Sequence, residues 1–223
     1  MQYYCTHCTA SISPVVAEVK KQISSYRREQ AEATKARIAE AARSLFARGG
    51  YSATSMDAIA RQAGVGNRTV YAAFGAKREI LNAICEEWLR RAGVRPLAEQ
   101  VLGASDPGAR LRGAAHWLTV LYATDFDVVR ILDSAIDEDQ ETRELLRGKL
   151  RGRNRVMDSL IASVEPDLTV PVADAQATFR ALAASGVYGE LVVESGWSPQ
   201  RFESWLADTL VSQLTDGKLK RAE

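Results

Sequence analysis

The sequence predicts an all-α protein of about nine helices, with a possible additional helix at the N-terminus. Apolar residues recur every three or four positions along most of the 223 residues, which is the spacing of helices with one buried face. No stretch of useful length alternates apolar and polar residues as a β-strand does. Glycine and proline divide the pattern into a short N-terminal group of helices and a larger helical region.

The charged residues are unevenly distributed along the chain. The whole chain has 29 basic and 28 acidic residues, and its formal charge of +1 excludes no class of partner. Residues 35–95 hold 11 basic and 5 acidic residues, whereas residues 96–223 hold 14 and 20. Positive charge therefore gathers in the first part of the chain, as is expected where a protein contacts phosphate.

The compartment is predicted from what the sequence lacks. No apolar run is long enough to span a membrane, and the N-terminus has no apolar stretch typical of a secretion signal. Cys5, Cys8 and Cys85 are too few for a disulfide framework. We therefore expect a cytoplasmic protein without a membrane partner.

Residues 1–34 are predicted to form an N-terminal extension. Ser13 and Pro14 fit an N-cap and first helical position, and neither glycine nor proline follows until Gly49. A narrow apolar stripe comprises Val15, Val19, Ile23 and Tyr26. We favour a solvated helix, separate from or continuous with the next one. The alternative is a basic arm beside DNA, formed by Arg27, Arg28, Lys35 and Arg37.

Cys5, His7 and Cys8 offer three atoms that zinc can bind. A closed structural zinc site needs four ligands, and no second pair of cysteines or histidines lies nearby. The sequence therefore favours a disordered tail and predicts neither a metal site nor a cofactor.

A domain over residues 35–80 begins with an amphipathic helix. Its apolar positions, at spacings of three and four, are Ile38, Ala41, Ala42, Leu45 and Phe46. Gly49 and Gly50 end this helix. Thr54, followed three residues later by Asp57, matches a capping box and predicts where the next helix starts.

Two short helical patterns, MDAIARQA and NRTVYAAF, are separated by Gly64, Val65 and Gly66. This is the sequence of a helix-turn-helix, because two helices are joined by a tight turn. The inward faces are predicted to hold Ile59, Ala60 and Ala63 in the first helix, and Val70 and Phe74 in the second. Gly75 ends the second helix, and Lys77 opens a fourth with Ile80, Leu81, Ile84 and Trp88 inward.

These spacings resemble the N-terminal domain of TetR-type (tetracycline-repressor-like) transcriptional regulators over about residues 35–90. The resemblance implies a homodimeric helical repressor whose domain over residues 81–223 binds a small-molecule effector and dimerises. Two positions depart from the family pattern. Gly66 replaces a frequent serine, so the cap can fall to Asn67, and Arg68 replaces a small residue.

The outward face of the second helix is suited to a major groove of double-stranded DNA. We expect base contacts from Asn67, Arg68 and Tyr71, although Tyr71 can also pack against the fourth helix. Phosphate contacts are expected from Thr54, Ser55, Thr69 and Lys77. A two-fold dimer would read a near-palindromic operator.

The second domain continues as helices separated by turns. Predicted helices run from Pro107 to about Tyr122, from Asp125 to Ile136, from Asp137 to a residue before Pro166, from Val170 to Glu194 and from Ser198 to Thr215. The effector pocket is expected to draw on Trp88, His116, Trp117, Tyr122, Arg130, Asp133 and Tyr188. The dimer interface is expected to use Phe179, Ala183, Gly186, Val187, Trp205, Leu206 and Leu210, unless these belong to the core of one chain.

Other classes of function have less support in the sequence. Two histidines far apart, no ordered Ser, His and Asp set and no glycine-rich phosphate loop give no indication of an enzyme. A helical ligand-binding or partner-binding scaffold without DNA contact is the alternative to a DNA-binding regulator.

Overall fold

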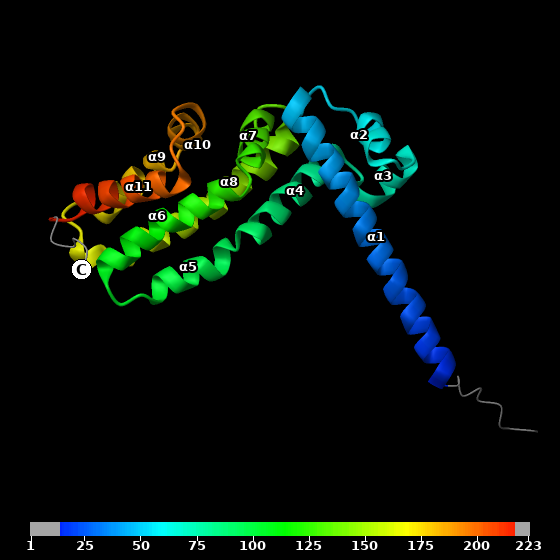
Figure 1. Ribbon diagram of the computed structural model, residues 1–223, viewed down its shortest axis with the longest axis horizontal. Coiled ribbons are helices and arrows are strands. Elements are labelled where there is room, and N and C mark those ends of the chain that lie inside the picture. The colour runs from blue at the N-terminus through cyan, green and yellow to red at the C-terminus, as the bar shows by residue number, and fades with distance from the viewer. Residues whose placement is uncertain (1–13, 217–223) are drawn as a thin grey trace, which may run out of the picture.

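A computed structural model describes residues 14–216. Within this range the chain forms eleven α-helices and two short segments, with no β-strand, which confirms the all-α class. The helices form an elongated molecule with a small group, α1–α4, at one end and the remaining helices at the other (Figure 1). None of the described helices is both long and apolar enough to cross a membrane.

The small group contains the helix-turn-helix. Its elements are α1 (Pro14–Gly49), α2 (Met56–Ala63), α3 (Asn67–Phe74) and α4 (Lys77–Ala92). Ile38 and Phe46 of α1, Ile59 of α2 and Val70 of α3 are buried together, as the apolar spacing predicted. Burying these four side chains holds α2 and α3 against α1.

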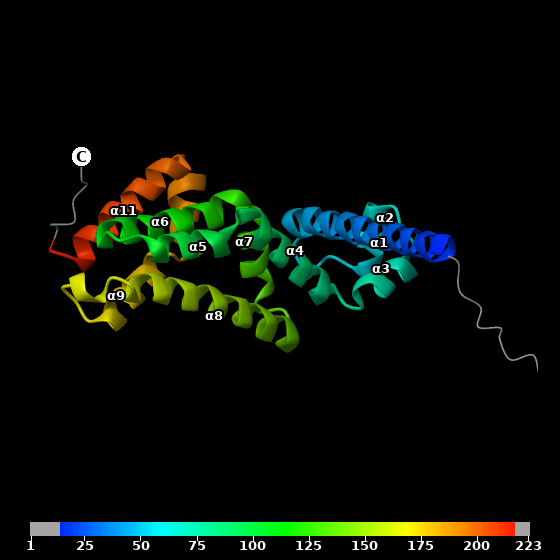
Figure 2. The same ribbon diagram turned by 90° about the horizontal axis from the view of Figure 1, so that it is seen from below.

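Helix α1 is a single helix of 36 residues, so the N-terminal extension and the first helix of the domain are continuous. The domain boundary expected after residue 34 lies inside this helix. The N-terminal part of α1 projects beyond α2 and α3 (Figures 1 and 2). Its continuity follows from the absence of glycine and proline between Pro14 and Gly49.

Two predicted caps differ from the structure. Ser55, rather than Thr54, caps α2, because its Oγ accepts a hydrogen bond from the Ala58 amide at 3.1 Å. Gly66, rather than Asn67, occupies the N-cap of α3 and supplies no side-chain bond. Gly64 between the helices has φ of 64°, a left-handed conformation that glycine adopts without strain.

The larger group is built around α6 (Pro107–Thr124). Around it lie α5 (Val94–Gly103), α7 (Phe126–Ala135), α8 (Gln140–Ala162), the 3₁₀ segment η1 (Glu165–Asp167), α9 (Val172–Leu182), α10 (Ser185–Tyr188), the π-helical segment η2 (Gly189–Glu194) and α11 (Pro199–Leu214). Asp106 caps α6, and Ser198 caps α11. Leu111, Leu118 and Leu121 of α6 are fully or almost fully buried.

The single helix predicted from Val170 to Glu194 is wrong. The chain leaves the helical conformation at Ala184, whose ψ is 136°, so α9 and α10 are separate helices. The Ala183 carbonyl accepts a hydrogen bond of 2.6 Å from the Tyr122 hydroxyl of α6. The Ala183 carbonyl, which lies outside the helix, is thus hydrogen-bonded in the core. The sequence did not indicate this break, because Ala183 and Ala184 are neither glycine nor proline.

Candidate DNA-binding site and interdomain hollow

Helix α3 exposes the side chains that the sequence assigned to DNA. Arg68 and Thr69 are exposed, and 51% of Tyr71 is exposed, while Val70 on the opposite face is fully buried. No described residue forms an ion pair with Arg68. A guanidinium on the exposed face of an eight-residue helix has the reach and geometry for a guanine edge in a major groove.

Asn67 links the two helices of the motif. Its Nδ2 donates a hydrogen bond to Oδ1 of Asp57 in α2, so the side chain lies at the junction of α2 and α3. The amide oxygen and the second N–H stay outside this bond. A bidentate contact with adenine uses one N–H and the amide oxygen, so it is compatible with the bond to Asp57.

Thr54 and Lys77 are used inside the domain. Thr54 is 7% exposed and its hydroxyl donates to the Gly50 carbonyl at 2.8 Å, so its side chain is not presented to a phosphate. The Lys77 ammonium donates to the carbonyls of Tyr51 at 2.8 Å and Ser52 at 3.4 Å and lies 4.2 Å from the centre of the Tyr51 ring. Both residues hold the loop that precedes α2.

A four-residue ion cluster joins the two groups of helices. Arg43 of α1 binds Asp125 Oδ1 at 2.7 Å and both carboxylate oxygens of Asp127 at 2.7 and 2.8 Å. Arg91 of α4 lies 2.9 Å from the other oxygen of Asp125, whose side chain is 8% exposed. We call these four residues the interdomain clasp. Arg43 lies 82 and 84 residues before its two carboxylate partners, so nothing local in the sequence marked these pairs.

The electrostatics of the clasp favour its charged form. The hydrogen bond from Arg43 lowers the pKa of Asp127 below its ordinary value, against the opposing effect of burial. The hydrogen bond to Asp127 raises the pKa of Arg43 further above its usual range. Both groups are therefore ionised at neutral pH.

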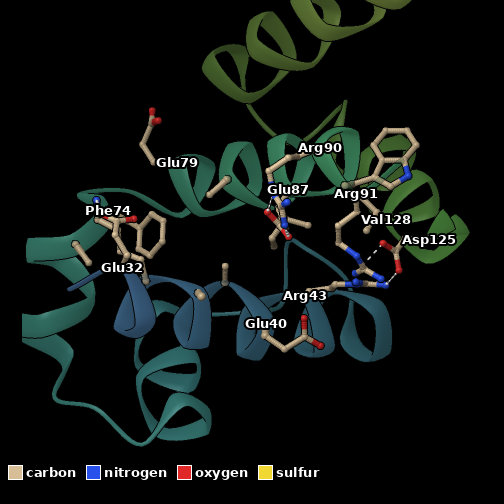
Figure 3. Close-up of a pocket in the computed structure, with 17 residues that line it drawn as sticks. Glu32, Glu40, Arg43, Phe74, Glu79, Glu87, Arg90, Arg91, Asp125 and Val128 are labelled. Atoms are coloured by element: carbon tan, nitrogen blue, oxygen red, sulfur yellow. Dashed lines mark hydrogen bonds and ion pairs between the residues drawn. The ribbon is translucent and has the colours of Figure 1, made fainter. Parts of the chain in front are cut away.

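A hollow of about 860 Å³ lies beside the clasp, between α1, α3, α4 and α7 (Figure 3). Phe74 at the end of α3, Trp88 of α4 and Val128 of α7 give it apolar walls. Its charged lining residues include Arg43 and Asp125 of the clasp. The hollow therefore touches both α3 and the connection to the larger domain.

The residues predicted for an effector pocket do not converge on one cavity. Trp88 lines the interdomain hollow, and its Nε1 donates to the Leu121 carbonyl at 2.9 Å. Arg130 and Asp133 line a second, open hollow of about 320 Å³, together with Gly186. That smaller hollow lies between α7 and the segment α10–η2.

Four of the predicted pocket residues have structural roles instead. Trp117 is buried and donates to the Val94 carbonyl at 2.8 Å. The rings of Tyr122 and Tyr188 pack edge to face at 5.3 Å in the core. His116 lies at the surface, where its Nδ1 is 3.0 Å from Glu203 Oε2. The spacing of apolar residues in the sequence predicted that these side chains lie on helices. It could not predict which groups they contact.

The residues predicted for a dimer interface separate into two sets. Phe179, Ala183, Leu206 and Leu210 are fully buried within one chain, so their side chains belong to its core. Gly186 is exposed, and Val187 and Trp205 are half-buried. Only this second set is open to a partner subunit.

The described residues show no cluster of three or more His, Cys, Asp or Glu side chains that could hold a metal. Cys5, His7 and Cys8 lie outside the described residues. Cys85 is buried, and burial raises the pKa of its thiol to about 11.

Comparison with known proteins agrees with the geometry of α1–α4. Residues 38–84 match the family described as bacterial regulatory proteins, tetR family. Residues 38–84 are a TetR-family DNA-binding domain. The match begins at Ile38, a buried residue of α1, and ends in α4, so it includes the complete helix-turn-helix.

Solved structures show that the TetR-type fold extends over most of the chain. NalD, the secondary repressor of the MexAB-OprM multidrug efflux pump in Pseudomonas aeruginosa, is 23% identical over 84% of this chain and 98% of its own, with a TM-score of 0.66. FadR from Bacillus subtilis, in complex with stearoyl-CoA, is 19% identical over 79% and 97%, with a TM-score of 0.64.

A third similar structure is a regulator from Saccharomonospora viridis in complex with choline. It is 19% identical over 83% of this chain and 99% of its own, with a TM-score of 0.65. No curated protein matches the chain by sequence. At these identities the structural likeness establishes the shared fold, and the TetR-family domain establishes a DNA-binding transcriptional regulator rather than an enzyme.

Proposed function

We propose that this protein is a homodimeric repressor that binds a near-palindromic operator and leaves it when a small organic molecule binds. The single observation that carries the proposal is the exposed face of α3 within a TetR-family DNA-binding domain. A cytoplasmic location follows from a chromosomal target.

The recognition surface consists of exposed residues in the first turns of α3 and at the start of α2. Arg68 and Tyr71 would contact base edges, and Asn67 would join them through the N–H and the oxygen that lie outside its bond to Asp57. Ser55 and Thr69, both exposed, would contact phosphates. Thr54 and Lys77 support this surface indirectly, by holding the loop before α2.

The second domain would supply the effector site and the dimer contact. Stearoyl-CoA and choline are the molecules bound in two of the similar structures, which supports a small organic ligand without naming it. Gly186, Val187 and Trp205 offer the accessible part of a dimer surface. Two copies related by a two-fold axis would present two α3 helices to successive major grooves.

Release would require a ligand that prefers a state with wrongly spaced recognition helices. The interdomain clasp and α4 connect the two groups of helices, so a ligand that rotates α4 or α7 would move α3 with them. The hollow between α1, α3, α4 and α7 would allow such coupling, because one occupant would touch both groups.

A mobility-shift assay with the DNA upstream of the protein's own gene tests DNA recognition. We expect preferential binding over a scrambled duplex of equal length. Equal affinity for the two duplexes would contradict sequence-specific repression and favour a scaffold.

Titration with stearoyl-CoA and with choline tests regulation in the same assay. A ligand that acts as effector lowers operator affinity in proportion to its own occupancy. Saturable ligand binding with unchanged operator affinity would exclude that molecule as an effector.

A further inference from the structure

The N-terminal part of α1 is a long helix whose purpose the DNA-binding domain leaves unexplained. The family match starts only at residue 38, and α1 begins 24 residues earlier. At about 1.5 Å per residue, that length corresponds to about 36 Å, close to one turn of B-DNA. The helix projects beyond α2 and α3 in Figure 1. We call residues 14–37 the α1 extension.

The side chains of the α1 extension sort by charge around the helix axis. At about 100° per residue, Lys21, Arg27, Arg28 and Lys35 fall within about 120° of arc, whereas Arg37 at the end of the extension lies outside it. Glu18, Glu29 and Glu32 occupy a neighbouring arc of about 60°. The exposed apolar residues Val19, Ile23 and Tyr26 occupy the remaining side. A solvated helix has no need of such separation, because mixed charges would make it equally soluble.

Three of the basic side chains are unengaged. Lys21, Arg27 and Arg28 are exposed, and none of them forms an ion pair with another residue of the range 14–216. Two of the acids are occupied, since Glu29 accepts a hydrogen bond from Ser25 at 2.8 Å and Glu32 one from Lys35 at 3.5 Å. The extension therefore presents free cations rather than balanced pairs.

The basic arc points to the side of α1 on which the helix-turn-helix packs. Farther along the same helix, Ile38, Ala42 and Phe46 are the side chains buried against the rest of the domain. Continuing the helical turn at about 100° per residue, the basic arc overlaps the direction of these three residues. The free cations thus lie on the side of α1 that carries α2 and α3.

We propose that the α1 extension is a second DNA-contacting element, which lies along the phosphate backbone flanking the sequence read by α3. Lys21, Arg27 and Arg28 make sequence-independent contacts, and the phosphates of double-stranded DNA supply the complementary charge. The proposal rests on the proposed function, because the orientation of the arm toward DNA follows from α3 being the reading helix. Its consequence is an operator footprint longer than the recognised sequence.

The test compares the wild-type protein with the triple variant K21A/R27A/R28A, called the arm variant because the α1 extension would act as an arm on DNA. Alanine keeps the helix, which circular dichroism can verify. A matched control, R147A/R151A/R155A, removes three exposed cations from α8 in the larger domain. Each protein is titrated with a duplex of the operator alone and with one extended by about 10 base pairs, one helical turn, on each side.

Wild type and control should bind the extended duplex more tightly than the short one, whereas the arm variant should lose that gain. The slope of log affinity against log salt is negative, and each lost phosphate contact makes it less steep by about 0.9. Three lost contacts therefore make it less steep by about 2.7 per arm. Between 50 and 200 mM salt, wild-type affinity should therefore fall about 40-fold more than that of the arm variant, per arm. Equal slopes and equal gains for wild type and arm variant would overturn the proposal.

A scrambled extended duplex separates this proposal from the proposed function. Phosphate contacts are independent of sequence, so the arm variant should bind scrambled DNA more weakly than wild type even if the protein has no operator preference. Wild type that binds operator and scrambled DNA alike would contradict only the repressor. A different result would assign the extension to contact between copies of the chain. In that case the arm variant binds DNA as wild type does, and wild type self-associates in a way that Tyr26→Ser abolishes.

Discussion

Replacing Lys77 with methionine distinguishes a phosphate contact from a structural role. The family resemblance favours a phosphate contact, whereas the structure shows the Lys77 ammonium bound to two carbonyls of the loop before α2 and stacked on Tyr51. A hydrogen bond from a charged donor contributes about 1.5–3 kcal/mol and a cation–π contact about 0.5–1 kcal/mol. Methionine retains the apolar stem, so the variant removes these polar contacts selectively.

We expect Lys77→Met to lower the free energy of unfolding by about 2–3 kcal/mol. Urea denaturation followed by circular dichroism measures this loss, which corresponds to a shift of the midpoint by about 1 M. Operator affinity should also fall, because the start of α2 loses its support. The slope of log affinity against log salt should stay unchanged, since no phosphate contact disappears.

Arg61→Met is the matched control, because it removes an exposed cation from α2 that binds no carbonyl. Its urea midpoint should equal that of wild type. Unchanged stability of Lys77→Met, together with a salt slope lower by about 0.9, would refute the structural role and restore Lys77 to the phosphate contacts.

Three further predictions address the recognition helix, the clasp and the packing of α5. Arg68→Ala should cost about 1–3 kcal/mol of binding on the operator and little on scrambled DNA in a mobility shift, and equal losses would make Arg68 a phosphate contact. The lowered pKa of Asp127 means that its pairing with Arg43 stabilises the fold above the ordinary aspartate pKa of about 3.9 and loses this effect as the pH falls through the lower folded value. The difference in unfolding free energy between wild type and Asp127→Asn should therefore shrink below about pH 4, whereas a constant difference would contradict the pairing. Gly113→Ala would place a methyl 2.8 Å from two carbons of Val101, and overpacking of this kind costs about 1–3 kcal/mol, which Val101→Ala in the same chain should largely restore in thermal unfolding.

The helices around the turn were predictable because their signals are local. Gly64 and Gly75 end α2 and α3 with positive φ, and Asp106 and Ser198 cap α6 and α11, each through neighbours in the sequence. The intervals between Ile38 and Phe46 likewise fix which face of α1 is buried. Such features depend on backbone geometry within a few residues, which any single chain segment carries with it.

The residue that caps α2 and the residue at which α9 ends were less predictable. Thr54 and Ser55 are both acceptable caps, and only the loop that buries Thr54 against Gly50 decides between them. The break at Ala183 depends on Tyr122, 61 residues away, because a carbonyl outside a helix needs a buried donor. A tertiary partner thus overrode helical propensity at Ala183.

The sequence by itself determined the all-helical class, the helix-turn-helix and the exposed residues of α3, since spacing and turn residues specify them. Only the tertiary structure decided where the long charged side chains go. Lys77 turned inward to loop carbonyls, Arg43 crossed to Asp125 and Asp127, and the free cations of the α1 extension came to lie on the side of the reading helix. These contacts depend on how the helices pack against one another. Such packing brings together side chains whose separation in the sequence gives no indication of contact.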